Sequence, residues 1–179
     1  MLVNPYIYQQ NPVNGNKTGL NNLVSQIGMN VQMPTPNRNY CIFNTPLVNE
    51  IVKHRESAIP AIVNVLNNTN NEKVIAESIY ILDRMIDSGV KGVENTYPAL
   101  SRFNNTNSPT IQVLLAGVYR KTQVPDAFGP LCRMLIRNSL LPSQNQYFDP
   151  AEEVGGAILE YLKNNAASEL YKNNPHKPS

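Results

Sequence analysis

The chain has 179 residues, of which 41% are hydrophobic, 15 are basic, 13 are acidic and two are cysteines. This length is typical of one domain with a substantial core. The near balance of charge argues against nucleic-acid binding, and two cysteines without a CxxC spacing argue against a disulfide scaffold. Because the first residues lack a signal-peptide pattern and no apolar run is long enough to span a membrane, the sequence predicts a soluble, cytoplasmic protein.

Residues 1–45 are rich in proline and asparagine and poor in charge, which predicts an irregular N-terminal arm. The arm contains one helical signal, since Leu20, Leu23, Val24 and Ile27 follow the i, i+3, i+4, i+7 pattern. We therefore expect a short amphipathic helix near 20–28. Such a helix is too short to be stable alone and must dock. Docking on its own domain is the preferred interpretation, and docking on a partner is the alternative.

From Thr45 onward the apolar residues recur at helical spacing. Thr45 followed by Pro46 is typical of an N-cap and the first position of a helix. Further helices are expected over 72–87, 91–103, 110–121 and 151–164, separated by asparagine-, glycine- or proline-containing turns. No segment alternates like a strand. The sequence thus predicts an all-α domain over 46–166, followed by a flexible tail over 167–179.

The helical region contains an internal repeat. Residues 60–70 read PAIVNVLNNTN, residues 98–107 read PALSRFNNTN, and a weaker copy begins at Pro130. The copies start 38 and 32 residues apart, a spacing typical of helical repeat proteins. Each copy predicts a proline-marked first helix, a polar turn and a second apolar helix.

In the segments 59–66 and 74–82 the chain resembles the HEAT-repeat family, and the resemblance covers roughly residues 46–165. It implies a short right-handed α-solenoid of HEAT-like helix pairs whose second helices line one face. The chain departs from the family pattern where Asn70 and Asn107 stand near the usual acidic position. Lys73 could serve as the basic residue of the first repeat only, so the family's ion-pair ladder between repeats is in doubt. A compact bundle without repeats is the alternative architecture.

Chemical motifs are scarce. The only histidines, His54 and His176, lack ligand partners at metal-binding spacing, and no phosphate loop or nucleophile motif is present. The neighbouring carboxylates of Glu152 and Glu153 point apart on a helix, so they do not predict an acid/base pair. We expect no catalytic residue, metal or cofactor.

The polar stripes of the second helices are the candidate binding surface, because a solenoid would line them up along one face. This predicts a non-catalytic scaffold that binds a protein partner, without nucleic acid or membrane. The alternatives are a solvated face with i, i+4 pairs such as Lys73–Glu77, a HEAT-like enzyme or enzyme subunit such as a chromophore-lyase-like protein, and a homo-oligomer or larger assembly. The candidate partner-binding residues are Lys73, Glu77, Tyr80, Arg84, Gln112, Tyr119, Arg120, Glu153 and Glu160.

Overall fold

The computed structural model describes residues 19–33, 43–140 and 149–166. These ranges are helical and contain no β-strand, which confirms the all-α prediction. The terminal tail over 167–179 and most of the N-terminal arm lie outside the described residues. The α-helices are α1 (Leu20–Val24), α2 (Pro46–Lys53), α3 (Ile59–Asn68), α4 (Glu72–Asp87), α5 (Tyr97–Leu100), α6 (Pro109–Thr122), α7 (Phe128–Ser139) and α8 (Pro150–Tyr161).

Helices α2, α4, α6 and α8 each begin at a residue whose side chain caps the helix. Thr45 caps α2, its hydroxyl accepting a hydrogen bond from the Val48 amide at 3.3 Å, and Pro46 follows as the first helical residue. Asn71 caps α4 and accepts from the Lys73 amide at 3.0 Å. These side chains satisfy amide donors that the first turn of a helix leaves free.

Pro60 and Pro98 occupy equivalent places. Each is the second residue of an α-helix, α3 or α5, and each helix follows directly on a 3-10 turn, Arg55–Ala58 or Val93–Thr96. A proline is tolerated there because the first-turn amide needs no partner within the helix. The helix predicted around 91–103 is present over 93–103, but only part of it is α-helical. The α-helical part begins only at Tyr97, and Ser101–Phe103 returns to a 3-10 turn.

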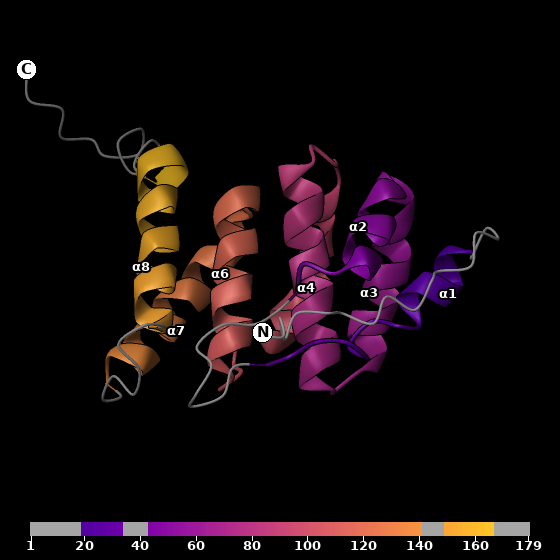
Figure 1. The fold of residues 1–179 in the computed structure, drawn as a ribbon. Coiled ribbons are helices and arrows are strands. Elements are labelled where there is room, and N and C mark those ends of the chain that lie inside the picture. Colours follow the sequence, from indigo (N-terminus) through magenta and orange to yellow (C-terminus); the bar gives the residue numbers. More distant parts are fainter. Residues whose placement is uncertain (1–18, 34–42, 141–148, 167–179) are drawn as a thin grey trace, which may run out of the picture.

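The second helices form a row. Figure 1 shows α4, α6 and α8 side by side in that order, with α6 packed extensively on both neighbours. Helix α3 packs on α4, and α7 packs on α8. The buried side chains of all these helices belong to one hydrophobic cluster. The burial of each leucine or isoleucine contributes about 1.5–3 kcal/mol, so this shared interior holds the pairs together.

Two arginines tie each helix pair to the one before it. Arg102, just after α5, donates through Nη1 to the Leu66 carbonyl in α3 at 2.7 Å. Arg137 in α7 donates through Nη2 to the Asn104 carbonyl at 2.9 Å and through Nη1 to Asn105 Oδ1 at 3.3 Å. Both arginines thus satisfy carbonyls at the end of the preceding first helix, which lack partners within their own helix.

The predicted helix near 20–28 is present as α1 and packs on α2 and α3 of its own domain. Leu23, Val24 and Ile27 are buried in that contact. The segment then turns at Gly28, whose φ is +87°. A Cβ at this position would lie 3.1 Å from the Val74 Cα and closer still to its side chain, so only glycine fits between the turn and α4.

Candidate functional site

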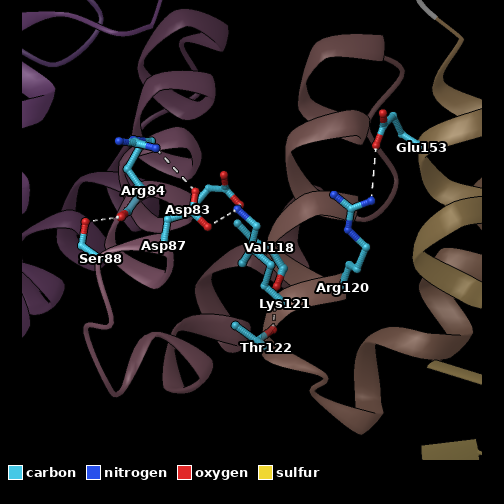
Figure 2. A network of polar contacts seen from close by, with 9 residues as sticks. All are labelled: Asp83, Arg84, Asp87, Ser88, Val118, Arg120, Lys121, Thr122 and Glu153. Carbon is cyan, nitrogen blue, oxygen red and sulfur yellow. Dashed lines mark hydrogen bonds and ion pairs between the residues drawn. The ribbon is translucent and has the colours of Figure 1, made fainter. Parts of the chain in front are cut away.

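A row of charged side chains runs along the C-terminal half of α4, across α6 and onto α8 (Figure 2). The row is built from adjacent second helices. We call it the polar ridge, and it consists of Asp83, Arg84, Asp87, Arg120, Lys121 and Glu153.

Lys121 is the fixed centre of the polar ridge. Its Nζ on α6 lies 2.8 Å from Asp83 Oδ1 and 2.7 Å from Asp87 Oδ1, both on α4. Burial alone would lower the pKa of Lys121, but the two carboxylates outweigh burial and raise the pKa. Gly117, one turn earlier on α6, faces Asp83, since a Cβ there would make ordinary van der Waals contact with Asp83 Oδ1 at 3.6 Å. The ammonium is therefore held between two helices and is not free to engage a partner.

The outer part of the polar ridge is looser. Arg84 Nη1 lies 3.6 Å from Asp87 Oδ2, with side chains 43% and 41% exposed. Arg120 Nη1 on α6 reaches toward Glu153 Oε2 on α8 at 3.9 Å, with side chains 41% and 49% exposed. Exposed ion pairs of this length contribute only about 0–1 kcal/mol. These groups can exchange their present contacts for those of a ligand at little cost.

The structure brings together three of the nine predicted residues, namely Arg84, Arg120 and Glu153. The ion pairs that join α4 to α6 and α6 to α8 were not predicted, because the family pattern places the basic residues of such pairs at the turns. Asp83, Asp87 and Lys121 are the ridge residues that lie outside the nine candidates. The available signal was the i, i+4 spacing of the two aspartates on α4 and the two adjacent cations near the end of α6.

Gln112 and Tyr119 are buried rather than on the exposed stripe. Gln112 Nε2 donates to the Thr106 carbonyl at 2.9 Å, and its Oε1 accepts from Asn138 at 2.8 Å. The Tyr119 hydroxyl donates to Asn104 Oδ1 at 2.8 Å, and burial raises the pKa of this phenol. Both side chains turn inward to partners outside α4 and α8, which are Asn138 on α7 for Gln112, and Asn104 and the Tyr97 ring for Tyr119.

Glu77 is also buried, with a fully covered side chain in the middle of α4. Its Oε2 accepts the Gly28 amide proton at 2.5 Å, whereas its Oε1 has no hydrogen-bond partner. Burial raises the pKa of Glu77, and the Gly28 amide and the Thr45 hydroxyl only partly offset that effect. The Lys73–Glu77 ion pair of the alternative interpretation does not form in the described part of the chain. Glu77 instead anchors the segment that follows α1.

The last three predicted residues stand apart from the polar ridge. Lys73 is exposed in the first turn of α4, far along the helix from Arg84. Tyr80 is half-buried and stacks on Phe43, with ring centroids 5.2 Å apart. Glu160 accepts from Asn164 Nδ2 at 2.8 Å near the end of α8.

A shallow open depression lies near the asparagine-rich turns. It is lined by Asn70, Ile75, Arg102, Phe103, Asn105 and Thr106. Its one cation, the Arg102 guanidinium, donates to the Leu66 carbonyl and lies 5.6 Å from the centre of the Phe103 ring. This charge is therefore engaged in joining helix pairs, which makes the polar ridge the stronger candidate.

The described ranges hold no cluster of three or more histidine, cysteine, aspartate or glutamate side chains suited to a metal. None of the helices in those ranges is both long and apolar enough to cross a bilayer. Cys132 on α7 is a free thiol and is half-buried.

The chain matches no family model, and no curated protein or solved structure is significantly similar to it. Functional inference therefore depends on the geometry of the polar ridge and of the helices that carry it.

Proposed function

We propose that this chain is a short right-handed α-solenoid of HEAT-like helix pairs that acts in the cytoplasm as a non-catalytic interaction module, binding a protein partner on the polar ridge. Three repeated features support the architecture. The second helices α4, α6 and α8 pack in a row, Pro60 and Pro98 occupy equivalent helix starts, and Arg102 and Arg137 make equivalent links to the preceding pair. Repetition of local contacts along a row is characteristic of solenoids.

The observation that carries the binding proposal is the loose outer edge of the polar ridge. Arg84, Arg120 and Glu153 come from successive helices, and each is about half exposed. Arginine is enriched at interface hot spots, since its planar guanidinium can pair with a carboxylate in a bidentate manner. The partner favoured by this edge is a protein surface that presents carboxylates to the two arginines and a cation to Glu153.

The test is quantitative affinity capture from the native source with the wild-type chain and a triple charge-reversal variant, Arg84→Glu, Arg120→Glu and Glu153→Lys. Binding on the polar ridge predicts that a partner enriched by the wild type is lost by this variant. Circular dichroism before capture establishes that the variant keeps its helical content.

The matched control reverses three exposed charges elsewhere, Lys53→Glu, Lys91→Glu and Glu94→Lys, and so changes the net charge by the same amount. The control should recover the partner as well as the wild type does. Equal recovery by the ridge variant, or equal loss in both variants, would contradict binding on the polar ridge.

A further inference from the structure

The outer side of α8 carries an exposed stripe whose residues follow helical spacing. Glu152, Gly156 and Leu159 of α8 stand at i, i+4 and i+7, and Lys163 follows at i+11 in the π-helical turn Leu162–Ala166 that continues α8; Leu159 is 58% exposed. The opposite side of the helix is buried through Val154, Ala157 and Tyr161. Among the described helices, α6 and α7 cover α8 from other directions, and nothing packs over this stripe.

Gly156 is unexplained by the fold of the single chain. A Cβ added there would meet no atom within 4 Å, so no neighbour requires the side chain to be absent. Glycine inside a helix is unfavourable compared with alanine, because it loses more conformational freedom on folding. Because Gly156 has no side chain, the stripe has a hollow at this position, one turn before the exposed Leu159 side chain.

The stripe is complementary to itself. If two copies of α8 cross in antiparallel fashion about a two-fold axis at the midpoint between Ala157 and Ile158, Leu159 of each copy faces Gly156 of the other. The same axis places Glu152 of each copy opposite Lys163 of the other, because 152 and 163 are also equidistant from that midpoint. A single two-fold rotation thus brings together complementary shapes and opposite charges, as a contact between two identical surfaces requires.

The cation of this stripe is free to change partners. Lys163 Nζ lies 4.0 Å from Glu160 Oε2, and the Lys163 side chain is 72% exposed. An exposed pair of this length contributes little stability. Glu152 is exposed in the first turn of α8 and makes no ion pair within the described ranges.

The opposite end of the row is already covered. There α1 packs on α2 and α3, with Leu23, Val24 and Ile27 buried, and Figure 1 places α1 and α8 at opposite ends. Head-to-tail stacking of copies would need that covered surface, whereas a two-fold contact through α8 does not. A closed dimer, rather than an open filament, follows from this asymmetry.

We propose that the exposed stripe of α8 is a homodimerisation surface, with a second copy of this chain as its occupant. Leu159 fills the hollow at Gly156 of the partner copy, flanked by two symmetry-related pairs between Glu152 and Lys163. This assembly is separate from protein binding on the polar ridge, and its test uses a different measurement.

The test is sedimentation velocity of the full chain over a wide range of concentration. The wild type should show a reversible monomer–dimer equilibrium. Leu159→Glu should weaken dimerisation by about a hundredfold, because it places two uncompensated charges at the centre of the contact. Met29→Glu is the matched control, since this methionine is 71% exposed near the opposite end of the row. It should leave the equilibrium unchanged.

Charge reversal tests the register of the two helices. Glu152→Lys or Lys163→Glu alone should weaken the dimer by about tenfold, because each change affects two pairs at once. The double variant Glu152→Lys/Lys163→Glu should restore the wild-type equilibrium. The proposal is overturned by a wild type that stays monomeric at every concentration, by a dimer indifferent to Leu159→Glu, or by a double variant that fails to recover.

Discussion

Replacing Glu77 by glutamine should make the protein more stable at neutral and alkaline pH. Above the pKa of Glu77 the wild type holds a fully buried carboxylate whose Oε1 has no hydrogen-bond partner. Glutamine preserves the shape and can still accept from the Gly28 amide, which lies 2.5 Å from Oε2 in the wild type. It removes the charge that burial disfavours.

The expected gain is the difference between two effects. A hydrogen bond to a charged acceptor contributes about 1.5–3 kcal/mol and a neutral one about 0.5–1.5 kcal/mol, so the amide weakens the Gly28 contact. Against this, the desolvation penalty of a buried ion reaches several kcal/mol. We expect Glu77→Gln to raise the free energy of unfolding by about 1–3 kcal/mol at alkaline pH.

The pH dependence has a definite sign. Because the pKa of Glu77 is raised in the folded protein above its ordinary value of 4.5, the folded state binds more protons than the unfolded state between these two values. The free energy of unfolding must therefore fall as pH rises through that interval, by at most about 1.4 kcal/mol per pH unit. The advantage of Glu77→Gln should be small below pH 4.5, grow with pH, and level off once wild-type Glu77 is fully ionised.

Urea unfolding followed by far-UV circular dichroism, repeated across this pH range, measures the difference directly. Glu94→Gln is the matched control, because it removes the same charge from an exposed side chain. Subtracting the change in unfolding free energy caused by Glu94→Gln from the change caused by Glu77→Gln isolates the contribution of burial. A wild-type minus Glu77→Gln difference that is constant with pH, or that favours the wild type increasingly as pH rises, would refute the reasoning.

Three further changes test other parts of the fold by equilibrium unfolding. Gly28→Ala should destabilise the domain by about 2–4 kcal/mol, since it combines a positive φ with a clash against α4, and hydrogen exchange should quicken in segment 19–33. Lys121→Met should cost about 1–2 kcal/mol because it removes the cation that joins Asp83 and Asp87 and leaves Asp87 only its exposed pair with Arg84, and since the pKa of Lys121 is raised, this difference should persist at neutral pH and be lost in strong alkali. Gly156→Ala should stabilise the monomer by about 0.5–1 kcal/mol while weakening dimerisation, two effects of opposite sign that a purely structural glycine would not produce.

Helix positions followed closely from the sequence where capping and periodicity agreed. The helix expected over 72–87 is α4, Glu72–Asp87, capped by Asn71, and Thr45 caps the helix that starts at Pro46. Apolar periodicity did not fix the type of helix around Pro98. The spacing there predicted one helix, whereas the structure has a four-residue α-helix between two 3-10 turns, although Pro60 stands at the same place in the ten-residue helix α3.

The candidate site was harder to predict, because a polar residue on a helix can face either solvent or a neighbouring segment. Glu77 belongs to the same helical stripe as Arg84, yet it is covered by Gly28, which lies 49 residues away in sequence. Gln112 is covered through Asn138 in the same way. Such long-range partners leave no periodic signal, whereas Arg84 and Arg120, near the C-terminal ends of α4 and α6, remain partly exposed.

The two proposed surfaces are compatible because of a simple property of helices. Glu152 and Glu153 are adjacent, so their side chains leave α8 about 100° apart. Glu153 points toward Arg120 on α6, whereas Glu152 belongs to the outer stripe with Leu159. A second copy on the outer stripe would therefore leave the polar ridge open, and the dimer would present two ridges. It follows that Leu159→Glu, which should weaken dimerisation by about a hundredfold, should not change the affinity of a single ridge for its partner, while it should reduce any avidity for partners that carry two binding sites.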